Sequence, residues 1–277
     1  MRRFFVEEIK EEENGFCVIG GSEARHILRV LRMGPGDRFV LMDRKGSRYQ
    51  VSIQSCSRRE VTVLLERPIP SPATSPAEIT LCQAILKSRS MDLLVQKATE
   101  LGVHRIVPFA SERTVIRLKG EQFASKSRRW KEIARNASKQ SDRERPLEIG
   151  PLLGFEELLA YGRKRSDLKL MLWEGEQDQD LKAVLSRHPD SRSFFAIVGP
   201  EGGFTEQEAA LARKSGIIAV SLGRRILRAE TAGLVLAAIL QYERGDLGSV
   251  ANETNAMAHQ GVLGPPARKG LDEEICP

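Results

Sequence analysis

The sequence predicts an α/β protein, in which a C-terminal domain with a mainly parallel sheet follows a small N-terminal β domain. Three observations support this fold class. Short apolar runs separated by turn residues fill roughly the first 70 residues. A proline-rich segment comes next, and beyond it strand-like and helix-like patterns alternate, as they do in βαβ units.

Composition limits the class of protein. The chain has 277 residues, which is enough for about two domains, and 41% of them are hydrophobic and 29% charged, as in a folded globular protein. No apolar run approaches the roughly 20 residues of a membrane span. The N-terminus turns acidic at Glu7 and Glu8, where a signal peptide would be apolar. We therefore expect a cytoplasmic protein without a membrane partner.

The four cysteines and four histidines are scattered, and no two cysteines form a CxxC pair. This pattern argues against a zinc site and against a disulfide framework, so we expect no metal. A site assembled from distant residues is the alternative that the sequence leaves open.

Positive charge is concentrated in one stretch. Eleven Lys or Arg and four Asp or Glu lie between Arg113 and Arg145, a net charge of +7 against +6 for the whole chain. Such a concentration is typical of a surface that binds phosphate. A solvated helix face is the alternative.

In the N-terminal domain, five short runs are expected to form a small barrel, namely 4–6, 16–19, 38–42, 48–53 and 61–65. One helix interrupts them at 22–32, with Ser22 as its N-cap. Arg25, Arg29 and Arg32 are spaced to share one face of that helix. This arginine stripe indicates either RNA contact or a simple exposed cationic face.

Prolines set the domain boundary. Four of them fall between Pro68 and Pro76, which forbids regular structure there. We predict a barrel domain at 1–70, a linker at 71–77 and an α/β domain at 78–247. Residues 248–277 lack apolar periodicity and are expected to be a disordered tail.

Within the α/β domain, strands are expected at 79–86, 104–109, 168–173, 194–198 and 217–222. Helices are expected at 91–101, around 130–137, and at 180–187, 205–215 and 229–242. Gly102 is placed to end the first helix, and Thr205 with Glu208 predicts a capping box. The helix at 229–242 is apolar nearly all round, so we expect it to be deeply buried or to form a dimer interface.

Two glycine-bearing loops follow predicted strands, where α/β domains bind ligands. They are GPEGGF at 199–204 and LGRRILRAETA at 222–232. The first matches neither a P-loop nor GxGxxG, which disfavours a nucleotide-phosphate cradle. Its glycines either admit close backbone approach to a ligand or only form a tight turn. In the second, arginines near a core need a ligand or a partner, and Glu230 is the candidate partner of Arg225 or Arg228.

These two loops resemble the signature of the knotted, SPOUT-type RNA methyltransferases, and more narrowly the ribosomal RNA small subunit methyltransferase E family. Further ordered matches extend the resemblance over roughly residues 1–245, namely RHILRVLR at 25–32, QKATELGV at 96–103, Glu112-Arg113, Arg129-Trp130 and Gln140-Ser141-x-Arg143. Two positions depart from the family pattern. Lys139 stands where the family has Glu, and Arg224 stands where it has Pro.

The resemblance implies a PUA-like RNA-binding barrel and a methyltransferase domain whose cofactor loops form a deep trefoil knot. It implies methylation of N3 of one uridine in 16S ribosomal RNA, within the assembled small subunit, with S-adenosylmethionine as donor. It also implies a homodimer. A knotted methyltransferase acting on ribose 2′-oxygen or another base is one alternative. A non-catalytic RNA-binding protein of ribosome assembly is another.

The predicted site has three parts. For the cofactor, apolar walls and backbone are needed, and the candidates are Leu172, Glu174, Gly199, Glu201, Gly202, Gly203, Leu222, Gly223, Ile226, Leu227 and Ala232. For catalysis, Arg228 is the candidate to stabilise the uridine imide anion, and Glu230 or solvent is the candidate base. For RNA, the candidates are Arg25, Arg29, Arg32, Arg113, Arg129, Gln140, Ser141 and Arg143.

Overall fold

The computed structural model describes residues 1–43, 45–70, 75–141, 143, 145–162 and 166–248. Apart from Gly248, the predicted tail lies outside the described residues, and so do residues 71–74 of the predicted linker.

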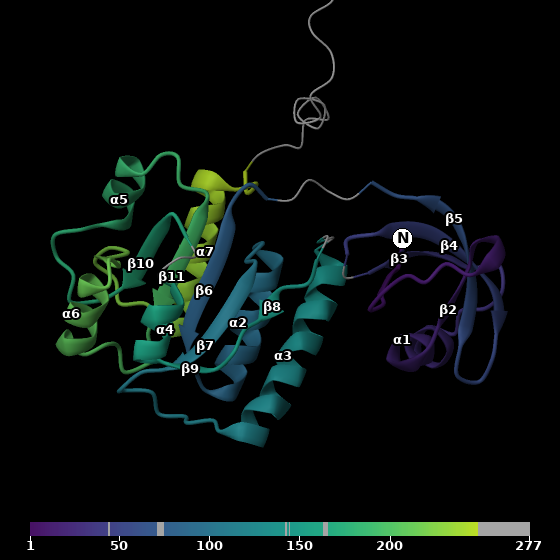
Figure 1. The fold of residues 1–277 in the computed structure, drawn as a ribbon, viewed down its shortest axis with the longest axis horizontal. Helices are drawn as coiled ribbons and strands as arrows, with labels where there is room; N and C mark the ends of the chain where they lie inside the picture. Colours follow the sequence, from purple (N-terminus) through teal and green to yellow (C-terminus); the bar gives the residue numbers. More distant parts are fainter. Residues whose placement is uncertain (44, 71–74, 142, 144, 163–165, 249–277) are drawn as a thin grey trace, which may run out of the picture. The chain divides into compact units, whose positions relative to one another are not determined.

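The N-terminal region forms the predicted β structure as one five-stranded sheet (Figure 1). Its strands are β1 (Arg3–Phe5), β2 (Phe16–Ile19), β3 (Arg38–Met42), β4 (Arg48–Cys56) and β5 (Val61–Pro68), and a 3-10 turn at Glu13–Gly15 precedes β2. The order is β1-β3-β4-β5-β2; β1 runs parallel to β3, and the other pairs are antiparallel. All five predicted strands are confirmed, and β4 and β5 extend further than expected.

The helix predicted at 22–32 differs in detail. It consists of α1 (Gly21–Arg25) and a π-helix over His26–Val30, and its N-cap is Gly20, not Ser22. Ala24 and Ile27 are fully buried in the core of the sheet, so packing decides which face turns inward. Arg25, Arg29 and Arg32 are all exposed. They do not share one α-helical face, because the π-helix widens the turn and Arg32 lies beyond it at φ +52°.

The C-terminal region carries a parallel sheet, as predicted. Its strands are β6 (Glu78–Ala84), β7 (Arg105–Ala110), β8 (Glu148–Ile149), β9 (Leu153–Gly154), β10 (Leu168–Leu172), β11 (Ser193–Val198) and β12 (Ile218–Val220). Their order is β12-β10-β11-β6-β7-β8, with β9 also beside β7, and each of these pairings is parallel. The two-residue strands β8 and β9 were not predicted, because two residues carry no periodicity.

Helices cover both faces of this sheet (Figure 1). On one face lie α2 (Ser88–Glu100), α3 (Gly120–Gln140), α5 (Leu181–Arg187) and α7 (Ala229–Arg244). On the other lie α4 (Phe155–Gly162), which was not predicted, and α6 (Glu206–Lys214). Alternate residues of β11 enter the two cores, as the period of a strand requires. The predicted capping box of α6 is present.

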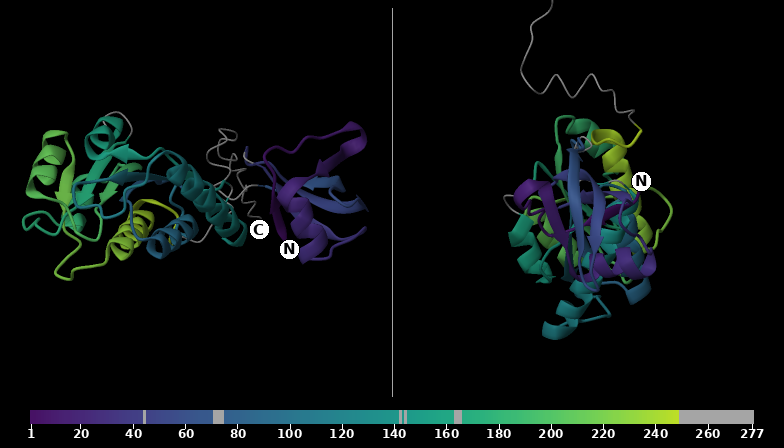
Figure 2. Two further views of the ribbon diagram at one scale, coloured as in Figure 1. Left: turned by 90° about the horizontal axis from the view of Figure 1, so that it is seen from below. Right: turned by 90° about the vertical axis from the view of Figure 1, so that its right-hand side faces the viewer.

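Helix α7 is only partly covered. It lies beside α2 (Figure 2), and Leu236, Ala237 and Leu240 are fully buried. Leu234 and Ile239 are half-buried, and Tyr242 is exposed. Within the described chain, the helix is therefore not deeply buried all round, and its outer face remains apolar.

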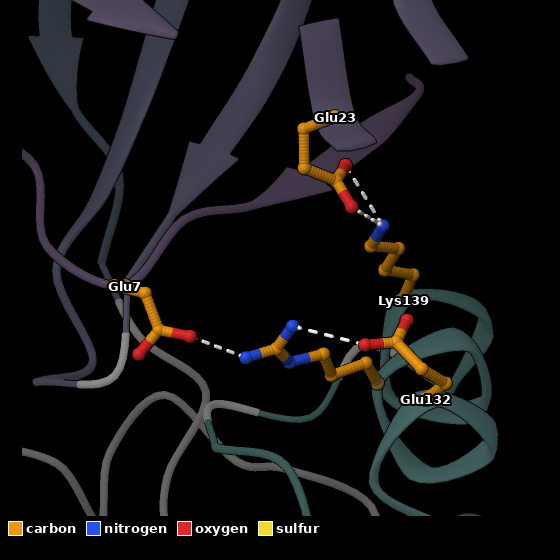
Figure 3. A network of polar contacts seen from close by, with 5 residues as sticks. Glu7, Glu23, Glu132 and Lys139 are labelled. Atoms are coloured by element: carbon orange, nitrogen blue, oxygen red, sulfur yellow. Dashed lines mark hydrogen bonds and ion pairs between the residues drawn. The ribbon is translucent and has the colours of Figure 1, made fainter. Parts of the chain in front are cut away.

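Lys139, one of the two departures from the family pattern, has a defined partner. Its Nζ lies 2.7 Å from Oε1 of Glu23 in α1, and the two side chains are only 10% and 17% exposed. Figure 3 shows this pair beside a second group, in which Arg135 bridges Glu7 and Glu132. The cation at 139 is therefore matched by a carboxylate from the N-terminal sheet domain.

The C-terminus of α2 is held by two long-range contacts. Gly102 adopts φ +79° and ends the helix as predicted, and Gln241 of α7 donates to its carbonyl at 3.1 Å. Arg143 donates from one guanidinium nitrogen to the carbonyls of Thr99, at 3.0 Å, and Val103, at 2.7 Å. Burial lowers the pKa of Arg143 to about 10. The structure thus gives Arg143 a helix-capping contact that the sequence did not predict.

We expect Arg143→Ala to destabilise the fold, because two carbonyls at the end of α2 lose a charged donor. Such hydrogen bonds contribute about 1.5–3 kcal/mol. Chemical denaturation measures the loss, with Arg128→Ala as the control, since Arg128 lies exposed on α3. An unfolding free energy equal to that of the control would show that the capping contact contributes nothing.

Candidate active site

The carboxyl ends of β6, β10, β11 and β12 meet at one edge of the sheet and surround a cavity of about 1020 Å³. Four segments form its wall. They are Lys87 and Ser90 after β6, most of residues 172–180 at the end of β10, most of residues 198–204 at the end of β11, and most of residues 220–232 at the end of β12. Both glycine-bearing loops singled out in the sequence therefore lie at the same cavity, as the rule for parallel sheets predicts.

The structure brings the predicted cofactor and catalytic residues together. All of the cofactor candidates except Gly202 line the cavity, and so do Arg228 and Glu230. Residues up to 60 positions apart in the sequence thus share one wall, because consecutive parallel strands deliver their loops to the same edge.

The first loop depends on its glycines for space. Gly203 adopts φ +67°, and a Cβ atom built there would overlap the carboxylate of Glu174. A Cβ at Gly199 would lie 2.9 Å from the ring of Phe204. Only glycine allows the loop to pass this close to its neighbours without strain.

The second loop is more exposed than expected. Arg224, Arg225 and Arg228 all have exposed side chains, so the expectation of arginines held near a core is wrong. Ile226 is 92% exposed although it is apolar and lines the cavity. Covering an isoleucine side chain is worth roughly 1.5–3 kcal/mol, so this loop favours a ligand or a second surface packing on it.

Glu230 has a different partner from the one expected. Ser90 of α2 donates to Oε1 of Glu230 at 3.2 Å. Within the described chain, no ion pair joins Glu230 to Arg225 or Arg228. The arginines extend into solvent at the mouth, whereas Glu230 lies on the first turn of α7 and faces α2.

Sequence reasoning missed most of the loop after β10. Glu176 is buried in this loop, and burial raises the pKa of its carboxyl. Hydrogen bonds from Arg213 and from the amides of Asp178 and Gln179 together lower that pKa by more than burial raises it, so the pKa lies below its usual value. Arg213 also lies over the ring of Trp173, 4.9 Å from its centroid. The sequence could have indicated this loop, because it directly follows the strand predicted at 168–173, at the same edge of the sheet as the two glycine-bearing loops.

The predicted RNA residues lie outside the cavity wall. Arg129 of α3 pairs with Asp92 at 2.8 Å, and Ser141 bonds back to the carbonyl of Ala137. Arg113 donates to the carbonyl of Gly202 at 3.1 Å, which ties it to the glycine loop. Each contact is internal, and none of them tests the predicted role in RNA binding.

The described residues contain no group of three or more His, Cys, Asp or Glu side chains arranged to hold a metal ion. None of their helices is long and apolar enough to cross a membrane.

Comparison with known proteins gives two family matches. Residues 73–241 match the RNA methyltransferase domain, and residues 19–66 match the RNA methyltransferase PUA domain. The α/β region and the N-terminal sheet are thus each similar to a known domain, and the cavity lies within the first match.

Curated relatives that match along nearly their whole length are ribosomal RNA methyltransferases by name. The chain is 30% identical over 255 residues to ribosomal RNA small subunit methyltransferase E of Bacillus subtilis, covering 89% of this chain and 100% of the relative. It is 29% identical over 232 residues to the protein of the same name from Aquifex aeolicus, covering 83% and 96%.

A solved structure is similar along nearly its whole length. The ribosomal RNA small subunit methyltransferase E of Neisseria gonorrhoeae, solved bound to S-adenosylmethionine, shares 34% identity with a TM-score of 0.80, and the match covers 89% of this chain and 99% of that one. Because the domain match spans more than half of the sequence and the relatives are covered almost completely, this chain belongs to the ribosomal RNA small subunit methyltransferase E family.

Proposed function

We propose that this protein methylates ribosomal RNA in the cytoplasm with S-adenosylmethionine as the methyl donor. The observation that carries the proposal is the convergence of the glycine loop, the 222–232 loop and the β10 loop on one cavity. The Neisseria relative, similar over nearly its whole length, binds this donor.

The cavity fits the chemistry of the proposed cofactor. Adenosine needs apolar walls and backbone partners, and Leu172, Leu222 and Leu227 supply such walls. The donor is cationic at sulfur and carries an ammonium group, and carboxylates of Glu174 and Glu201 line the same space. When bound, S-adenosylmethionine would supply an electrophilic methyl group at this position.

The residues around the mouth fit an RNA base as acceptor. Uridine N3 becomes a good nucleophile only when its imide proton is lost. Arg228, exposed at the cavity mouth, would stabilise the anion at O2 or O4. Glu230 would act as the base, with its carboxylate oriented by the Ser90 hydroxyl, or would leave that proton to solvent.

The finer proposal is that the target is N3 of a uridine in 16S ribosomal RNA, within the assembled small subunit. It rests on the motif resemblance, in which GPEGGF and ILRAETA are intact. The proposed trefoil knot rests on the same resemblance, whereas the proposed domain division at residues 70 and 78 rests on the proline-rich segment between Pro68 and Pro76.

Nucleoside mass analysis of small subunits incubated with the protein and S-adenosylmethionine tests the function. We expect a new N3-methyluridine in 16S ribosomal RNA. A ribose 2′-O-methyl product would support a different specificity, and cofactor and RNA binding without any product would support the assembly role.

The variant Gly203→Ala tests whether the cofactor binds beside the glycine loop. The added Cβ would overlap the exposed Glu174 carboxylate at a backbone φ of +67°, so Glu174 must move within the cavity wall and calorimetry should show weaker cofactor binding. Gly216→Ala is the control, because Gly216 also has a positive φ, +77°, but a Cβ there meets nothing within 4 Å. Equal losses in both variants would point to backbone strain instead of the cavity.

We also propose that exposed cations outside the cavity contact RNA phosphates. Arg29 of the π-helix and Arg128 of α3 are exposed. Arg29→Ala and Arg128→Ala should each lower the slope of log affinity against log salt by about one unit, leaving cofactor affinity unchanged. Lys182→Ala on α5 is the control, and an equal slope change there would refute a specific RNA face.

Finally, we propose a homodimer that covers the outer face of α7. Leu234, Ile239 and Tyr242 leave an apolar stripe on that helix, and such stripes are typical of interfaces. Light scattering at micromolar concentration should give twice the chain mass. Tyr242→Glu should shift the mass toward the monomer, whereas Lys182→Glu should not; a monomeric unmutated protein would contradict the proposal.

A further inference from the structure

We propose that Gln83 and Arg113 are positioning residues that hold the glycine loop, residues 199–204, in the shape needed for cofactor binding. The inference rests on the proposed function and concerns two side chains that do not themselves line the cavity as described. Both donate to carbonyl groups at the ends of the loop.

Gln83 anchors the beginning of the loop. It lies on β6 and is fully buried, and its Nε2 donates to the carbonyl of Gly199 at 3.1 Å and, at longer distances of 3.3 and 3.4 Å, to those of Ala84 and Val198. Strand β11 ends at Val198, so the pairing of the sheet no longer orients the peptide of Gly199. The amide supplies the donors that a further strand residue would otherwise provide.

The carbonyl half of the Gln83 amide has no hydrogen-bond partner within the described residues. Its Oε1 is buried and makes no hydrogen bond within the described chain. Burying such an atom opposes folding, and an apolar residue of similar size would avoid the cost. The donor side of the amide therefore answers a requirement other than core packing.

Helix α7 has a glycine at the position where it packs against this amide. Gly233 of α7 lies against it, and a Cβ atom there would come within 2.9 Å of Oε1 of Gln83. The glycine gives the amide room to keep its orientation toward the loop.

Arg113 anchors the other end of the loop. Its NH1 donates to the carbonyls of Gly202, at 3.1 Å, and Phe204, at 3.5 Å. Gly202 packs directly on it, since a Cβ there would lie 3.2 Å from Cβ of Arg113. The adjacent amide of Glu112 donates to Glu208 of α6 at 2.9 Å, which fixes the segment that carries Arg113.

The two anchors act on the population of loop shapes. Residues 199–203 include three glycines and pair with no strand. The Gly203 amide donates to the Pro200 carbonyl and the Lys87 amide donates to Glu201, so the middle of the loop is held, and loss of an anchor would loosen its ends. Apparent cofactor affinity falls in proportion to the fraction of molecules with the competent shape. Loss of an anchor should therefore weaken cofactor binding without removing any atom from the cavity wall.

The test compares S-adenosylmethionine binding by calorimetry in the full chain. We expect Arg113→Ala to raise the Kd roughly three- to tenfold, as when the competent shape falls to between a third and a tenth of the population. Arg113→Lys should restore part of the affinity. Arg117→Ala, also exposed on the same segment, is the control and should bind like the unmutated protein.

Two substitutions of Gln83 that remove or alter its hydrogen-bond donor test its role as an anchor. Gln83→Leu removes the donor and should weaken binding at every pH. Gln83→Glu can donate to Gly199 only while its carboxyl is protonated, so its affinity relative to the unmutated protein should fall as pH rises. Because ionisation of a buried carboxyl also destabilises the fold as pH rises, the unfolding free energy of Gln83→Glu is measured over the same pH range, and an affinity loss that only follows global unfolding would contradict the anchor.

Hydrogen exchange separates this inference from the proposed function. Peptides covering 199–204 should exchange faster in Arg113→Ala than in Arg117→Ala without any ligand. If the unmutated protein does not bind S-adenosylmethionine, the proposed function fails, and exchange still tests the anchors. Unchanged exchange and cofactor affinity in Arg113→Ala would overturn the inference, as would a loss confined to RNA affinity.

Discussion

The site depends on one constraint, the parallel pairing of β6, β10, β11 and β12. Parallel strands end at the same edge, so every loop that follows one of them is delivered to one place. The pairing is itself held by two apolar layers, α2, α3, α5 and α7 on one face and α4 and α6 on the other. The cavity is the space at that edge which neither layer fills.

Loops at a sheet edge lose the ladder that orients a strand, and this chain replaces it with side chains. Gln83 and Arg113 bond the carbonyls of the glycine loop, and Glu176 holds the β10 loop through the amides of Asp178 and Gln179. Glycine then becomes necessary where these anchors draw segments together, as at Gly203 against Glu174. The same logic operates away from the cavity, where Arg143 caps α2.

Most of the fold could be predicted because apolar periodicity reports burial, and burial decides each element. The five strands of the N-terminal sheet, the strands β6, β7, β10, β11 and β12, and the helices α2, α3, α5, α6 and α7 follow from that pattern. The prediction was weaker where the pattern is short or shared. The strands β8 and β9 have two residues each, α4 follows β9 directly without a cap signal, and the π-helix at His26–Val30 has the same apolar spacing as an α-helix.

The fold class and the two glycine-bearing loops of the cavity followed from the sequence, because hydrophobic period and glycine placement are local properties. The partners of the charged side chains became known from the three-dimensional structure alone. Glu230 meets Ser90 and not an arginine, Lys139 meets Glu23, and Arg143 meets the end of α2. A long polar side chain can reach many neighbours, and the packing of distant elements determines which of them is near.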